Sequence, residues 1–173
     1  MNSTWSRIKA VFAGNSAPGN QMDPPLEPVV TVDPVVALQE RLRDIVRSAN
    51  RHGGRLPDGA VPAVHEIEDV LRPLLVHVAK RGAGVEAMHD LEAIVQDYLP
   101  GALDRYLDLP ADYALGNRGP SGTTPAVELV AQLKLLAAGS RDLYRAVYDH
   151  DAQQLATQGR FLDAKFRHSD LEL

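Results

Sequence analysis

Hydrophobic residues recur every three or four positions along most of the chain, which is the spacing of one face of an α-helix. The clearest helix follows Asp33, which is placed to cap it, and begins at Pro34 and ends before Gly53. No stretch of useful length alternates hydrophobic and polar residues as a β-strand does. The pattern therefore predicts an all-α fold. The apolar face of this first helix consists of Val35, Leu38, Leu42, Ile45 and Ala49.

Two further apolar series follow, and each crosses a proline. The second runs from about residue 62 to residue 80 across Pro73, which lacks a backbone donor and should bend the helix. The third crosses Pro100, which is expected either to begin a new short helix or to kink a long one. Their apolar positions are Val64, Ile67, Leu71, Leu74 and Val78, then Val85, Met88, Leu91, Val95, Tyr98, Leu99, Leu103, Tyr106 and Leu107.

Residues 109–124 are typical of a loop, and Thr124 and Pro125 are placed to begin the next helix. The helical pattern then passes residues 149–151 (Asp-His-Asp) and resumes after them. Gly139 and Gly159 lie inside it and weaken a helix, so they predict close helix contact or a local break. The apolar positions are Leu129, Leu133, Leu136, Leu143, Val147, Leu155, Leu162 and Phe166.

These elements predict one domain. We expect a single antiparallel bundle of five to six helices over residues 34–168, followed by a short tail at 169–173. A chain of 173 residues is long enough for one such core. Aromatic residues make up only 5% of it, which leaves the core mainly to Leu, Val and Ala. Residues 14–33 contain four prolines among Gly, Asn and Asp and predict a flexible linker.

Residues 1–13 predict a separate short amphipathic helix. Trp5, Ile8 and Phe12 fall on one stripe, and Arg7 and Lys9 add positive charge. Such a helix suits weak, reversible contact with an anionic membrane surface or with a protein partner. Docking of the same stripe onto the bundle is the alternative.

The overall composition excludes several classes of site. Without cysteine the chain cannot form a disulfide, a thiolate metal site or a cysteine nucleophile. No run approaches the length of apolar sequence that spans a membrane, and the first residues are too polar for a secretory signal. We therefore expect a cytoplasmic protein, peripheral on the inner face of the membrane if the first helix binds there. The net charge of -5 gives no general attraction for nucleic acid.

One local stretch is basic. Arg43, Arg47 and Arg51 recur every four residues and form a stripe beside the apolar face of the first helix, which predicts either a solvated surface or a site for an anion or an acidic partner. Glu40 and Asp44 compensate part of this charge. We do not expect nucleic acid here, because no aromatic residues interleave the arginines as stacking platforms would require.

The stretch DYLPGALDRYLDLP, residues 97–110, predicts a packing hinge. Tyr98 and Tyr106 should place their rings in a helix seam, and Leu99 and Pro100 set the direction of the chain between them. A groove for a ligand or a partner is the alternative interpretation, since tyrosine is common in interfaces.

This stretch and the region that follows it resemble the bacterial XpaC-like family. The resemblance covers Leu91 to Phe166 and includes Tyr98-Leu99-Pro100, a long following helix and a final helix after Asp151. That family is named for hydrolysis of a bromo-chloro-indolyl phosphate dye and often occurs beside toxic-anion resistance proteins. The resemblance implies a helical bundle near a membrane and an accessory phosphohydrolase or anion-resistance role, without assigning a catalytic residue.

The polar residues themselves do not predict catalysis. Glu86 and His89 have the spacing of a di-metal ligand pair but lack the second such pair that this site needs, and they fall off the apolar seam. His65 with Asp69, and His150 between two aspartates, are typical of surface pairs. We expect no catalytic residue, no cofactor and no metal. The sequence therefore favours a non-enzymatic helical module that binds an unidentified protein partner.

Overall fold

The computed structural model of the chain describes residues 33–120 and 122–169, with side chains as far as residue 166. Every element in these residues is helical, which confirms the all-α prediction. The predicted amphipathic helix at 1–13 lies outside the described residues, as do the linker up to residue 32 and the end of the tail. The elements are α2 (Pro34–Arg51), α3 (Ala60–Arg81), α4 (Val85–Glu92), the π-helical η1 (Ala93–Tyr98), α5 (Leu99–Leu107), α6 (Ala111–Gly116) and α7 (Pro125–Ser169).

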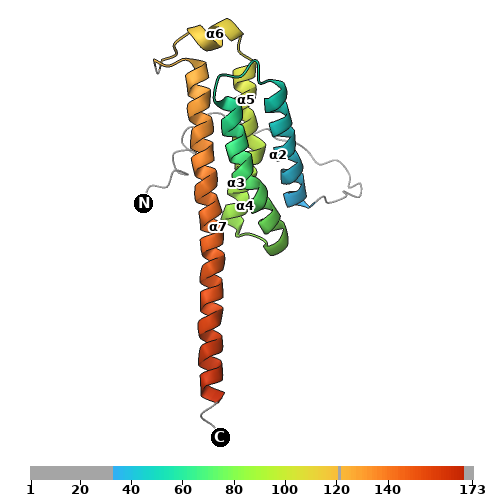
Figure 1. The fold of residues 1–173 in the computed structure, drawn as a ribbon, viewed down its shortest axis with the longest axis vertical. Helices are drawn as coiled ribbons and strands as arrows, with labels where there is room; N and C mark the ends of the chain where they lie inside the picture. Colours follow the sequence, from blue (N-terminus) through green and yellow to red (C-terminus); the bar gives the residue numbers. More distant parts are fainter. Residues whose placement is uncertain (1–32, 121, 170–173) are drawn as a thin grey trace, which may run out of the picture.

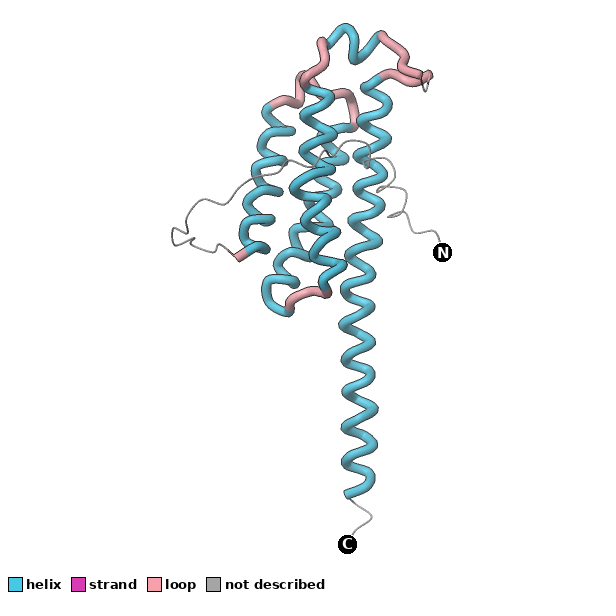
Figure 2. The backbone as a smooth tube through the Cα atoms, turned by 180° about the vertical axis from the view of Figure 1, so that it is seen from behind, coloured by secondary structure: helices cyan, strands magenta, loops and turns pink. Residues whose placement is uncertain are grey.

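The helices alternate in direction (Figures 1 and 2). α2 and the continuous run α4–η1–α5 point one way, α3 and α7 point the other way, and α6 crosses the end where α7 begins. α3 packs between α2 and α7, while α5 packs against α7 and contacts α2 on its other side. The described helices thus form an antiparallel bundle in which neighbours in space close a ring.

The core follows the predicted apolar faces. Leu38, Ile67, Leu91 and Leu133 are almost completely buried, one from each of the main helices. α2 begins as predicted, because the Asp33 side chain accepts a hydrogen bond of 2.9 Å from the backbone N–H of Val35. Among the predicted apolar positions before α7, Val85 is the exception, since it is 89% exposed at the first position of α4.

Two boundaries differ from the prediction. α3 begins at Ala60, where Gly59 adopts a positive φ of 88° that favours glycine. Pro73 lies inside α3 on its exposed side. The predicted loop at 109–124 contains a short helix, α6, whose Ala114 is buried in the core. A helix of six residues with one small buried side chain has too short a pattern to be predicted.

Pro100 neither follows a loop nor ends a helix. It is the second residue of α5, which directly follows the π-helical residues of η1, so the chain stays helical from α4 to Leu107. A proline ring in a helix clashes with the carbonyl four residues earlier, which here belongs to Gln96 in η1. The π-helical turn, which is wider than an α-helical turn, contains the residue whose carbonyl would clash.

α7 does not stop at Asp151, which corrects the prediction of a separate final helix. It runs unbroken for 45 residues through Gly139 and Gly159. Gly139 is buried in the bundle, whereas every residue from 152 to 166 is exposed. The packed body therefore ends near residue 151 instead of residue 168. We call residues 152–169 the α7 extension; it projects beyond the other helices (Figure 1) and is about 27 Å long.

Candidate functional site

The two features singled out in the sequence meet in one groove. A cavity of about 320 Å³ lies between α2 and α5, and Arg47 and Arg51 line it together with Pro100 of the Tyr-Leu-Pro motif. We call this the arginine groove. Its other charged residues are Arg41, Asp44 and Asp104.

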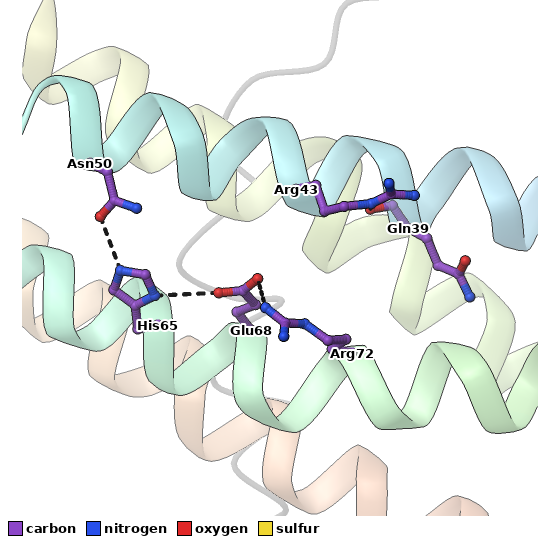
Figure 3. A network of polar contacts seen from close by, with 6 residues as sticks. All are labelled: Gln39, Arg43, Asn50, His65, Glu68 and Arg72. Atoms are coloured by element: carbon purple, nitrogen blue, oxygen red, sulfur yellow. Dashed lines mark hydrogen bonds and ion pairs between the residues drawn. The ribbon is translucent and has the colours of Figure 1, made fainter.

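Arg43, the remaining residue of the predicted stripe, lies apart from this groove. Its Nε donates to the Gln39 carbonyl at 3.2 Å, and it lines a different cavity of about 430 Å³ with Glu68 and Arg72 of α3. Figure 3 shows it across from Arg72. A step of four residues advances about 40° around a helix, so Arg43 and Arg51 lie about 80° apart. The three arginines therefore face two different neighbours.

The charge in the arginine groove is largely compensated. Arg47 forms an ion pair with Asp44, and both side chains are more than half exposed. Asp104 adds a second carboxylate opposite Arg41 and Arg51. Three guanidinium groups against two carboxylates leave one positive charge, which suits a single acidic group on a partner more than a polyanion.

The remaining residues of the predicted hinge motif belong to the core. Leu99 is fully buried, Tyr106 is 6% exposed, and Tyr98 is half-buried. Tyr106 is part of the hydrophobic core, and Tyr98 packs against it. Of the four motif residues, Pro100 is the one that lines the arginine groove.

A second polar cluster joins α2 to α3 (Figure 3). The buried Glu68 carboxylate lies 3.3 Å from Nδ1 of His65 and forms an ion pair with Arg72. Nε2 of His65 lies 3.0 Å from Oδ1 of Asn50 on α2. His65 thus pairs with Glu68 and not, as predicted, with Asp69. This cluster satisfies a buried carboxylate and so has a structural role.

The end of the bundle from which the α7 extension projects has contacts that the sequence did not predict. Nε2 of His77 on α3 and Oδ2 of Asp151 on α7 are 2.7 Å apart. The His77 and Tyr148 ring centroids are 4.5 Å apart, and the Tyr144 and Tyr148 centroids are also 4.5 Å apart. Burial raises the pKa of Tyr148 above its usual range, and the neighbouring Tyr144 and Asp151 raise it further. His77 and Asp151 are 74 residues apart, and no local spacing signals such a pair.

An apolar hollow lies beside these contacts. It encloses about 490 Å³ between the α3–α4 connection, α4 and α7, where Leu143, Ala146 and Val147 form its floor. Glu86 and Asp151 lie on its rim. Glu86 and His89 are both exposed, as predicted. Lys80 and Arg81, the last residues of α3, add positive charge at the same end of the bundle.

The α7 extension presents large apolar side chains to solvent. Leu155 is 71% exposed, Phe161 64%, Leu162 41% and Phe166 63%. Their exposure is unlike that of Leu133 and Leu136, which lie earlier on the same helix and are fully buried.

The described residues provide neither a metal-binding cluster nor a membrane-spanning helix. Across 33–120 and 122–169 no group of three or more His, Cys, Asp or Glu side chains is placed to hold a metal ion. None of the helices in those ranges combines the length and the apolar character needed to cross a bilayer. Trp5, Arg7, Ile8, Lys9 and Phe12 of the predicted membrane or partner stripe lie outside the described residues.

Comparison with known proteins gives no family for this chain. No family model matches it, and neither the curated proteins nor the solved structures include a significant match. The resemblance to the XpaC-like family therefore stays a prediction.

Proposed function

We propose that this chain is a non-enzymatic protein-interaction module, in which the helical bundle holds the α7 extension out for binding. The exposure of every residue from 152 to 166, four large apolar side chains included, carries this proposal. An isolated helix of this length is marginal in water, and its exposed apolar surface gains free energy when another protein covers it. A helix of a partner fits such a surface, because apolar side chains at three- and four-residue spacing pack against a facing helix.

The arginine groove supplies a second contact. An acidic side chain on the partner could pair with Arg41 or Arg51, while Pro100 and Leu103 offer apolar surface beside it. Because these arginines are near the surface, this contact weakens as salt rises. This contact in the arginine groove orients the partner more than it strengthens binding.

Peripheral membrane association through residues 1–13 is part of the same proposal. Its support is the sequence pattern of Trp5, Ile8 and Phe12 beside Arg7 and Lys9. Deletion of residues 1–20 should leave the thermal melt nearly unchanged and abolish binding to anionic vesicles. A melt lowered by many degrees would instead assign this segment to the core.

Capture of partners from an extract of the native cells tests the module. The chain carrying Leu155→Gln, Leu162→Gln and Phe166→Gln should lose the bound proteins that the unchanged chain retains. A matched control carries Gln153→Ala and Thr157→Ala on the opposite face of the same helix. An unchanged set of captured proteins, or an empty one from the unchanged chain, rules out the extension as the binding element.

A further inference from the structure

The α7 extension carries one continuous apolar face, formed by Leu155, Gly159, Leu162 and Phe166. We call it the extension stripe. These residues step by four, three and four positions, which places them along one side of the helix. A Cβ atom at Gly159 would meet nothing within 4 Å, so the single chain has no steric need for glycine there. Glycine weakens a helix interior but permits close approach of another backbone, which is the property that a helix partner would use.

The order of the stripe is self-complementary. Because the steps of four, three and four read the same in both directions, a second copy running antiparallel matches the stripe position for position. Leu155 of one copy then lies opposite Phe166 of the other, and Gly159 lies opposite Leu162. The small residue therefore receives a large one, as in knobs-into-holes packing.

The bundle itself selects the antiparallel orientation. Tyr148 lies two helical turns before Leu155 on the same face of α7, and α3 covers it there through the His77 ring at 4.5 Å. In a parallel pair both α3 helices would have to fit between the two α7 helices, which pack about 8–10 Å apart. In an antiparallel pair each bundle lies beyond the end of the other extension.

Charge favours the same orientation. On α7 itself, Asp149 and Asp151 lie where the helix leaves the bundle, whereas the extension carries Arg160 and Lys165 against Asp163. Lys80 and Arg81 at the end of α3 add positive charge at the same end of the bundle. An antiparallel pair brings Lys165 of each extension nearer to Asp151 of the other copy than a parallel pair does, and a parallel pair would place the Asp149 and Asp151 carboxylates of the two copies together.

We propose that the partner of the extension stripe is a second copy of this chain, in a symmetric antiparallel dimer. This inference rests on the proposed function and names its partner. A twofold axis between residues 160 and 161 makes both halves of the interface identical. Two copies bring six large apolar side chains to the interface, and each is 41–71% exposed in the single chain. Since a fully covered aromatic side chain buries about 150–250 Å², the paired stripes bury on the order of 500–1,000 Å² in total, at or below the lower limit of specific interfaces. The dimer is therefore weak and concentration-dependent.

Sedimentation equilibrium of the full chain tests the dimer. The mass should double as concentration rises from about 1 µM to about 1 mM. Phe166→Gln should raise the dissociation constant at least tenfold. Phe161→Gln is the matched control, because Phe161 is equally exposed but turned about 100° from Leu162; it should change the constant less than threefold. An equal rise of the dissociation constant in both variants would show non-specific association of apolar surfaces and would contradict an interface formed by the extension stripe.

Engineered cysteines test the orientation, since the natural chain has none. A mixture of Leu155→Cys and Phe166→Cys chains should form a disulfide between them under mild oxidation. Each chain alone should not, because its two cysteines would lie eleven residues apart along the pair, about 16 Å, beyond the reach of a disulfide. Efficient cross-linking of Leu155→Cys alone would show a parallel pair and overturn the proposal.

The outcomes separate this inference from the proposed function. A chain that stays monomeric at every concentration but captures another protein through the stripe overturns the dimer and leaves the module intact. A monomer that captures nothing overturns both. A monomer whose extension is protected from amide exchange only when residues 1–20 are present would assign the stripe to that segment and also overturn the dimer.

Discussion

At the scale of single residues, one helix contains both extremes of environment. Leu136 and Leu155 lie on α7, yet Leu136 is fully buried between helices and Leu155 is 71% exposed. The same residue type therefore stabilises the fold at one site and presents apolar surface to solvent at the other. Burial decides which role a leucine has, because apolar stabilisation scales with the area removed from water.

We expect Leu136→Ala to lower the free energy of unfolding by about 2–5 kcal/mol, because it leaves a cavity in a close-packed core. The control is Val127→Ala, on the same helix but 56% exposed, which should change stability by less than about 0.5 kcal/mol. Urea unfolding followed by circular dichroism measures both. Similar losses for the two variants would contradict the core assignment.

Tyr148 gives a prediction on pH. Its pKa is raised by burial first and by Tyr144 and Asp151 next, so the folded chain holds this proton more tightly than the unfolded chain. Stability should therefore fall as the pH rises above the usual tyrosine pKa of about 10. Tyr148→Phe should remove part of that fall. The control Tyr113→Phe changes an exposed tyrosine.

Titration of tyrosinate absorbance checks this directly. One of the five tyrosines should ionise later than the others in the folded chain, and Tyr148→Phe should remove that late step. A late step that persists in this variant would assign it to another tyrosine.

Single-residue chemistry was only partly predictable from the sequence. The Asp33 cap could be predicted because cap and helix are adjacent in the chain. The different cavities that Arg43 and Arg47 line could not be predicted, because spacing alone does not say which neighbouring helix each side chain meets. The His77–Asp151 contact could not be predicted at all, since it depends on how α3 and α7 pair in space.

At the scale of elements, α7 and the α4–η1–α5 run depart most from the sequence pattern. The apolar series along α7 continues past residue 151. An apolar face that is buried in a core has the same residue spacing as an apolar face that is exposed to solvent. The pattern therefore predicted helix correctly and could not tell packed helix from projecting helix. Likewise, Pro100 predicted a disturbance but not its form as a π-helical turn.

The lower end of α7 is fastened to α3 by polar contacts. We expect Asp151→Ala to remove the His77 hydrogen bond and to raise amide exchange in residues 145–151 about two- to tenfold, the effect of one lost hydrogen bond. Hydrogen exchange with mass spectrometry measures this. Asp149→Ala is the control, because Asp149 is exposed on the same turn. An equal increase in both variants would show that helix fraying, and not the His77 contact, sets the exchange rate.

At the scale of the whole molecule, the buried core and the exposed apolar stripe lie on different parts of the chain. The buried residues of α7 end at Val147, whereas the four large apolar residues of the extension contact nothing in the core. Removal of the extension should therefore cost little folding free energy. The same removal should abolish self-association, because the extension stripe goes with it.

A chain that ends at Asp151 tests this division. At a concentration where the full chain is monomeric, the two should melt within about 3 °C, since 1 kcal/mol corresponds to about 2–4 °C at this size. The helical signal in circular dichroism should fall with the loss of residues 152–169. A chain that ends at Tyr144 is the comparison, because it also loses the buried Val147 and the His77–Asp151 contact, and it should melt clearly lower. If the chain ending at Asp151 melts as low as that one, the extension stabilises the bundle and is not a free binding element.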